Sequence, residues 1–394
     1  MLVPPYAWVL TILAIAGLLA FDFFFHVRKP HEPTLGEAAR WSALYVGIAV
    51  CFGIGVWVFG GSDSGQQYFA GYLTEKALSV DNLFVFLIIL SSFSVPRKLQ
   101  QKVLLFGIAV ALVARTAFIF AGAALINQFA WVFYIFGLIL FITGGHMLLD
   151  DGDKEDEADN VAIRLAKRFL KTTDHYDADR MTTVENGRRR FTPMLLVMVA
   201  IGGTDILFAL DSIPAIYGLT QDVYLVFTAT AFSLLGLRQL YFLIDGLLDR
   251  LIYLSYGLAA ILAFIGAKLV LHALHENTVP FINDGRHVPV VEISTGLSLG
   301  VIVGVLAITV VASLISPAGR ARTLAANAAM HAREYLRVTY EASPEDREIA
   351  FAKMQDEAAK LQTLPNKQQV RIQEDGTLPA LIEKAQRVHA ELTV

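Results

Sequence analysis

Long apolar runs alternate with short polar gaps along this chain, and that feature restricts the possible folds more than any other. A run of about 18 apolar residues or more is long enough to cross the hydrocarbon core of a membrane as a helix. Of the 394 residues, 55% are hydrophobic and only 17% are charged, whereas about 25% are charged in a typical soluble protein. The sequence therefore predicts an all-α, polytopic membrane protein.

Nine membrane-spanning helices are predicted, and together they form a transmembrane domain over residues 1–316. Their ranges are about 4–26, 41–60, 66–93, 101–126, 129–149, 191–217, 222–245, 250–273 and 293–316. We interpret the first run as a retained span rather than a cleaved signal peptide, because its basic residues follow the run instead of preceding it. A loop at 150–190 carries acidic and basic clusters, and residues 317–394 form a helical tail in which Ser343 starts a helix.

The distribution of Lys and Arg between the connecting loops predicts how the chain is oriented. The loops after the first, third, fifth and seventh spans are basic, whereas the loops on the other side are nearly bare, with Arg286 as the exception. This pattern indicates a multi-pass protein of the plasma (inner) membrane. Its N-terminus is expected outside, and its C-terminus and the loop at 150–190 are expected in the cytoplasm.

Two short motifs place carboxylates inside apolar runs: TEKALSVDN at 74–82 and TDILFALDS at 204–212. The residues that align, first motif before second, are Thr74 and Thr204, Glu75 and Asp205, Asp81 and Asp211, and Asn82 and Ser212. The motifs lie three spans apart, so their helices cross the membrane in opposite directions. Arg115 and Arg238 then occupy similar positions in the spans that follow. We predict two inverted three-helix repeats, spans 3–5 and 6–8, an arrangement of transporters that bind substrate near the midplane.

The carboxylates must be explained, because a charged side chain at the bilayer centre costs about 2.5–3.5 kcal/mol even on a lenient insertion scale. One explanation is structural ion pairs, for which the chain offers Lys76, Arg115, Arg238 and Lys268. The other is a ligand. On a helix, two acids six residues apart lie about 120° apart around the axis. Each motif, with Ser79 in the first, therefore forms a wide polar wedge suited to lining a cavity.

Every ligand that the wedges offer is an oxygen atom of a carboxylate, amide, hydroxyl or backbone carbonyl. Such a set suits hard cations such as Mg²⁺, Ca²⁺ or Mn²⁺, and a proton relay through the same acids is the competing interpretation. Gly202, Gly203 and Pro214 bracket the second wedge and are expected to loosen its helix. Asp22, near the end of the first span, either joins this pathway or lies at the membrane interface.

Several stretches, GYLTEKALSVDNLFVF, FSVPRKLQQKVLLFGI, TDILFALDSIPAIYGLT and LLGLRQLYFLIDG, resemble the TerC family of integral membrane proteins, including its Alx-like members. The resemblance covers spans 1 to 9. It implies manganese export, tellurium resistance by the family's name, and distant kinship with LysE-type exporters and with cation exchangers built from inverted repeats. The metal-pathway residues that it implies are Glu75, Asp81, Asn82, Asp205, Asp211 and Asp22.

The sequence departs from that family pattern in two places. Members usually carry an acid three residues before the aspartate that corresponds to Asp205, and this chain has Gly202 there. A potential ligand or proton carrier is therefore missing, which affects the choice of metal and of coupling ion. The long tail beyond residue 317 is also not expected of the core family.

These features lead to the hypothesis of a Mn²⁺ exporter that works by alternating access, with H⁺ as the exchanged ion. The carboxylates that would bind the cation are those of Glu75, Asp81, Asp205 and Asp211. Neutral oxygen ligands would come from Asn82 and Ser212, with Ser79 beside them. The positive charges that would balance the acids in the empty site are those of Lys76, Arg115 and Arg238. Two alternatives stay open. One is a membrane scaffold of a metal or tellurite stress response that docks cytosolic proteins through 317–394, and the other is a LysE-type exporter of another small solute. No enzyme activity, resident cofactor or nucleic-acid partner is expected, and a homo-oligomer is left open.

Overall fold

The computed structural model of the protein describes residues 3–27, 35–93, 95–129, 131–149, 180–185, 188–244, 253–276, 282–283, 288–338, 344–363 and 377–392. The chain divides into two compact units. The first comprises Met1–Phe242 and Ser255–Leu306, and the second comprises Leu243–Leu254 and Ala307–Val394. The acidic start of the loop at 150–190 and the predicted helix start at Ser343 lie outside the described residues.

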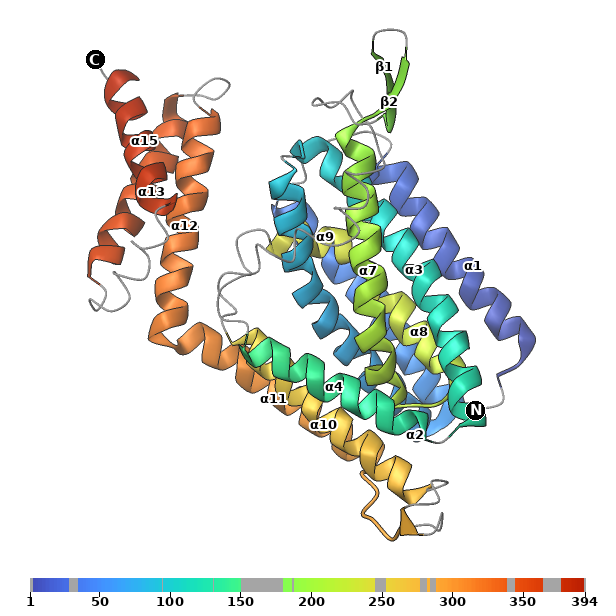
Figure 1. Cartoon of the computed structure of the whole chain (residues 1–394). Coiled ribbons are helices and arrows are strands. Elements are labelled where there is room, and N and C mark those ends of the chain that lie inside the picture. The colour runs from blue at the N-terminus through green and yellow to red at the C-terminus, as the bar shows by residue number, and fades with distance from the viewer. Residues whose placement is uncertain are drawn as a thin grey trace. The chain divides into compact units, whose positions relative to one another are not determined.

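The described elements are almost all helices, coloured in chain order in Figure 1. They are α1 (Pro5–Asp22) with a π-helical turn (Phe23–Val27), α2 (Leu35–Ser92), α3 (Arg97–Gln128), α4 (Val132–Leu149), α7 (Pro193–Tyr217), α8 (Val223–Leu234), α9 (Leu237–Ile244), α10 (Leu254–His275), α11 (Thr295–Ile315), α12 (Pro317–Val338), α13 (Pro344–Gln362) and α15 (Thr377–Leu392). An antiparallel hairpin, β1 (Thr182–Glu185) and β2 (Arg188–Phe191), was not predicted.

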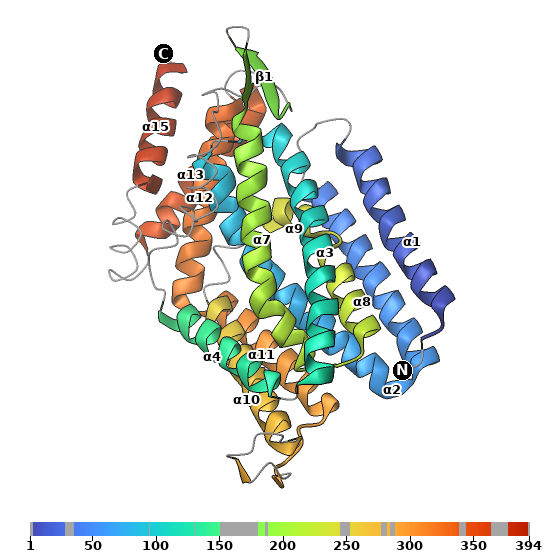
Figure 2. The same cartoon turned by 45° about the vertical axis from the view of Figure 1, so that its right-hand side comes forward.

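The first unit is a bundle in which α7, α3 and α1 run side by side, in the same order in both views (Figure 1; Figure 2). Among the described residues, seven helices are long and apolar enough to cross a membrane, and Val132–Leu148 is a shorter apolar helix. Large apolar side chains are exposed on these helices, including Leu13, Phe59 and Val113, as an outer surface in contact with lipid requires. The prediction of a polytopic all-α membrane protein is confirmed.

α2 is a hairpin of two helices, because the backbone leaves the helical conformation at Gly61, where φ is 88° and ψ is 169°. The Tyr68 hydroxyl donates a 3.0 Å hydrogen bond to the carbonyl of Ala49, and the rings of Trp57 and Phe69 lie 6.3 Å apart. Residues before Gly61 could not contact residues this far after it in a straight helix. The two halves of α2 therefore correspond to the second and third predicted spans. The count of nine spans stays a prediction.

The seventh predicted span is interrupted. α8 ends at Leu234 and α9 begins at Leu237, and Gly236 between them has a φ of 78°. A β-carbon on Gly236 would lie 2.7 Å from Cβ of Tyr45 on α2. Only glycine therefore suits both the left-handed backbone and the available space. Discontinuous helices of this kind occur at the binding sites of many secondary transporters.

α7 is one continuous helix that passes through Gly202 and Pro214, so these residues do not break the sixth span, and the expected loosening stays a prediction. The glycines allow close packing. A β-carbon on Gly202 would lie 3.3 Å from Cγ1 of Val110 on α3, and one on Gly107 of α3 would lie 2.6 Å from a side-chain carbon of α7. Small residues at such positions let two membrane helices approach closely, and this contact supports α7 along its length.

The helix pairs of the first unit are those that an inverted repeat requires. α2 packs extensively on α8, and α3 packs extensively on α7. A two-fold rotation that exchanges the second half of α2 with α7, and α3 with α8, would exchange these two contacts. On α4 and α10, a β-carbon on Gly137 would lie 3.0 Å from the Gly266 carbonyl oxygen, and one on Gly266 would lie 3.1 Å from the Gly137 carbonyl oxygen. Reciprocal contacts of this kind are expected at a two-fold axis. The repeat stays a prediction, with these contacts in its favour.

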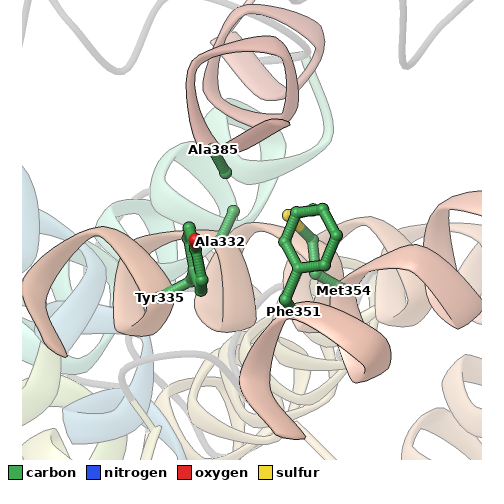
Figure 3. Close-up of a cluster of buried hydrophobic side chains, with 5 residues drawn as sticks. All are labelled: Ala332, Tyr335, Phe351, Met354 and Ala385. Atoms are coloured by element: carbon green, nitrogen blue, oxygen red, sulfur yellow. The ribbon is translucent and has the colours of Figure 1, made fainter. Parts of the chain in front are cut away.

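The second unit contains three amphipathic helices of the tail, α12, α13 and α15, around a small apolar core (Figure 3). Ala332 and Tyr335 of α12 meet Phe351 and Met354 of α13, and Ala385 of α15 joins the same cluster. A polar contact also links α12 to α15 beside this cluster: the Tyr335 hydroxyl lies 3.0 Å from Nδ1 of His389. The tail is thus a packed three-helix module with its own core.

Candidate functional site

The first acidic motif lies on the second half of α2, the helix that packs on α7 and α8. Thr74 and Glu75 are each 1% exposed, Ser79 is 0% exposed and Asn82 is 9% exposed, while Asp81 is partly buried. The polar wedge therefore faces the interior of the bundle, as its spacing predicts.

The second motif lies on α7, and its polar side chains also face the interior of the bundle. Thr204, Asp205 and Ser212 are each at most 2% exposed, and Asp211 is partly buried. The Thr204 hydroxyl donates a 2.8 Å hydrogen bond to the carbonyl of Ala200 one turn earlier. Because α2 and α7 pack against one another, both wedges lie within one bundle interior.

Arg115 of α3 is the cation shared by these acids. Its side chain is 0% exposed, and its Nη1 forms an ion pair with Oε1 of Glu75. Asp205 and Asp211 also interact electrostatically with the guanidinium, and Asp81 interacts with Asp211. Four carboxylates from two helices and one arginine from a third thus form a single electrostatic cluster, which we call the acidic cluster.

Several hydroxyls around the acidic cluster are buried without a hydrogen-bond partner among the described residues. They belong to Thr74, Ser79, Ser212 and Thr230. A buried polar atom left without a partner costs about 1–3 kcal/mol, and most such atoms in proteins are satisfied by protein, water or a bound ion. The interior beside the acidic cluster is therefore suited to taking up water or a cation.

The carboxylates do not converge on a common point in this conformation. Within the described residues, no group of three or more His, Cys, Asp or Glu side chains is placed to hold a metal ion. The predicted arrangement, in which the four acids surround a cation, stays a prediction. Arg115 lies among them and pairs with Glu75.

Asp22 belongs to a second polar network, away from the two wedges in sequence. Its Oδ1 accepts hydrogen bonds from Nη2 of Arg238 at 2.8 Å, from the Tyr45 hydroxyl at 2.9 Å and from Nε2 of Gln239 at 2.8 Å. Nη1 of Arg238 donates a further 2.8 Å bond to Oε1 of Gln101. Asp22 is 4% exposed, so protein encloses its side chain, and its carboxylate has an arginine partner. The choice between a place in the pathway and a place at the membrane interface stays open.

Lys76 connects the first motif to the interruption between α8 and α9. Its Nζ donates a 3.0 Å hydrogen bond to the carbonyl of Ser233, in the last turn of α8. The carbonyls of the last turn have no partner within their own helix, and the interruption at Gly236 leaves this one available. The three expected counter-charges therefore have different partners. Arg115 forms an ion pair with Glu75, Arg238 forms an ion pair with Asp22, and Lys76 donates a hydrogen bond to a backbone carbonyl.

A cavity of about 360 Å³ lies near the C-terminal end of α7, between that end, α2 and α10. Gln67, Thr220, Asp222, Lys268 and His272 are among its lining residues. The Thr220 hydroxyl donates a 2.6 Å bond to Oε1 of Gln67. Gln67 precedes Thr74 by seven residues, or about 10 Å along α2. The cavity thus lies toward one end of the same helices that carry the acidic motifs.

Sequence reasoning missed the neutral side chains of the second network, Tyr45, Gln101 and Gln239. Tyr45 and Gln239 lie in apolar runs, where a single Tyr or Gln draws little attention beside a carboxylate, and Gln101 lies in the basic stretch at the start of the fourth predicted span. Polar residues in such runs are rare and are usually paired, which is the signal that could have found them.

A family model and several curated relatives that match this chain are all described as membrane proteins. The model of a family described as "Integral membrane protein TerC family" matches residues 60–321. The chain is 58% identical over 382 residues to a membrane protein of Mycobacterium tuberculosis called uncharacterized, with 96% of each chain covered. It is 40% identical to a likewise uncharacterized membrane protein of Myxococcus xanthus, covering 79% of this chain and 92% of the relative. It is also 38% identical to Alx of Escherichia coli, provisionally named a membrane-bound redox modulator, covering 77% and 93%. No solved structure matches the chain.

Proposed function

Because the chain belongs to the TerC family of integral membrane proteins, we propose that it transports a divalent metal cation across the plasma membrane. The specific proposal is export of Mn²⁺ by alternating access, in exchange for H⁺. The N-terminus lies outside and the C-terminus in the cytoplasm. The cation is the substrate, and no resident cofactor takes part.

The observation that carries this proposal is the acidic cluster inside an otherwise apolar bundle. Four carboxylates face the interior on two helices, and Arg115 is the cation that interacts with three of them, Glu75, Asp205 and Asp211. Structural ion pairing alone would need about one cation for each acid, because an unpaired buried charge is strongly destabilising. Carboxylates that no cation pairs with must be neutralised in another way, by a bound proton or by a bound divalent cation, and transport in exchange for H⁺ uses both. The oxygen ligands suit Mn²⁺.

Two further features support transport. The interruption between α8 and α9 brings the Ser233 carbonyl to Lys76 of the first motif, and broken helices at a central site are typical of secondary transporters. The cavity near the end of α7 lies on the outer side in the proposed orientation, where an exported cation would leave. After the metal cation has left, protons bind to some of the carboxylates, because buried carboxylates must be neutralised while the site returns to the other side of the membrane.

The tail favours one alternative function. The second unit is a packed three-helix module, which fits a membrane scaffold that docks cytosolic proteins in a metal or tellurite stress response. That function does not require the acidic cluster, so substitutions there distinguish it from transport. Export of another small solute, in the manner of LysE-type proteins, is distinguished by measuring whether the purified protein transports Mn²⁺.

The experiment that tests the proposal is Mn²⁺ flux into proteoliposomes that contain the purified protein. Asp81→Asn and Asp211→Asn should reduce flux to background while the protein stays folded. Glu383→Gln is the control, because Glu383 is an exposed acid of α15 outside the first unit, and it should leave flux unchanged. Equal flux in all four proteins, or none in the wild type, would refute the proposal. Flux that does not respond to a pH gradient would remove H⁺ exchange alone.

A further inference from the structure

Arg115 is placed where a transported cation would be expected. Its guanidinium is 0% exposed, pairs directly with Glu75, and interacts with Asp205 and Asp211 on the opposing helix. Its charge therefore acts on acids of both motifs. A permanent cation at this position offsets part of the negative charge of the four acids from within the protein.

Resting on the proposed function, we propose that Arg115 is a tethered counter-cation that competes with the transported metal ion. In the cation-free protein the guanidinium neutralises Glu75. When a divalent cation enters, it takes over the carboxylates and the guanidinium leaves Glu75. After the cation is released, Arg115 returns, and the empty site can reorient across the membrane.

The chemistry of arginine suits this role. A guanidinium stays protonated at all physiological pH values, so Glu75 needs no proton during the cation-free return. Lysine could lose its proton when buried, and a neutral side chain would leave the carboxylates to repel one another in a low-dielectric interior. The fork of the guanidinium can also reach more than one carboxylate, which agrees with its interactions with both motifs.

The second arginine provides the contrast. Arg238 pairs with Asp22, but it also donates to Gln101, and Asp22 receives two further hydrogen bonds from Tyr45 and Gln239. In these contacts Arg238 meets a single carboxylate, and neutral side chains supply the other hydrogen bonds. Arg115 instead faces more acids than it can neutralise. Arg238 is therefore a matched buried arginine with a structural role.

The test separates two fluxes in proteoliposomes. Net Mn²⁺ transport requires the cation-free site to reorient, whereas exchange of labelled Mn²⁺ outside for unlabelled Mn²⁺ inside does not. In Arg115→Gln we expect net transport to fall about tenfold or more, and exchange to stay within about twofold of the wild type. The concentration of Mn²⁺ at half-saturation of exchange should fall, because the competing cation is gone. Arg115→Lys should give net transport between that of Arg115→Gln and that of the wild type, because a buried lysine can lose its proton and its charge with it.

Arg238→Gln is the control, and it should lower both fluxes in proportion to the amount of folded protein. If Arg115→Gln behaves in that way too, Arg115 is structural and the proposal is overturned. It is also overturned if neither flux changes. If the wild type carries out neither flux, the proposed function fails, and the role of Arg115 fails with it.

A double variant covers the case in which Arg115→Gln does not fold. Replacing both partners of a buried ion pair is tolerated better than replacing one, because the direct partner is not left charged and alone. Glu75→Gln combined with Arg115→Gln should therefore fold better than Arg115→Gln, although Asp205 and Asp211 still lose a cation. Its ratio of net transport to exchange should return toward the wild-type ratio, with weaker Mn²⁺ affinity from the lost ligand. A ratio that stays about tenfold below wild type would contradict the proposed pairing.

Discussion

Replacing Gly236 by alanine tests whether the interruption between α8 and α9 is built into the fold. Gly236 has a φ of 78°, and a residue with a β-carbon in this left-handed conformation costs about 1–2 kcal/mol. The added β-carbon would also lie 2.7 Å from Cβ of Tyr45, and relieving such overpacking typically costs about 1–3 kcal/mol. The two effects together should destabilise the first unit by about 2–5 kcal/mol.

The assay is thermal unfolding of the purified protein in detergent, with Gly304→Ala as the matched control. Gly304 lies in α11, and a β-carbon there would meet nothing within 4 Å; alanine is also favoured over glycine inside a helix. We expect the unfolding midpoint of Gly236→Ala to fall by several degrees and that of Gly304→Ala to stay or rise. An unchanged midpoint for Gly236→Ala, or an equal fall in both variants, would refute the reasoning.

Three further predictions concern other parts of the chain. Glu75→Gln removes the direct ion-pair partner of the buried guanidinium and should cost at most about 3–5 kcal/mol, because Asp205 and Asp211 still interact with Arg115. Glu383→Gln breaks an exposed pair on α15 and should cost less than about 1 kcal/mol. Thermal unfolding measures both. Gly202→Asp should reduce the yield of folded, monodisperse protein, because its β-carbon would press on Val110, and adding Val110→Ala should recover part of that yield. Phe351→Ala removes a ring from the core of the tail and should destabilise that module by about 3–5 kcal/mol. Limited proteolysis should become faster while Mn²⁺ flux stays unchanged, and loss of flux would link the tail to transport.

Much of the fold follows from the sequence, because apolar runs of this length have few alternatives to membrane helices. The hairpin at Gly61 was expected as two separate spans, since a polar gap, SDSG, interrupts the apolar residues there. The interruption at Gly236 was not expected, because Leu235 and Gly236 lie in an ordinary apolar run. It depends on a contact with Tyr45, which is far away in the sequence.

The candidate site shows the same division between local and distant information. Spacing within each motif was enough to predict that the acids face the bundle interior, and the burial of Glu75 and Asp205 agrees with that prediction. Spacing could not reveal which base meets which acid. Arg115 and Arg238 occupy similar positions after the two motifs, yet Arg238 pairs with Asp22 of the first span. The metal-binding roles of all these residues stay predictions.

Equilibrium binding of Mn²⁺ to the purified protein tests most directly whether the acidic cluster is a cation site. Free Mn²⁺ can be followed by its electron paramagnetic resonance signal, in the wild type, Asp205→Asn and Glu383→Gln. The proposed function predicts saturable binding by the wild type and Glu383→Gln, and about tenfold weaker binding or more by Asp205→Asn, since a buried carboxylate ligand is lost. Equal affinity in all three proteins, or no saturable binding in the wild type, would contradict it.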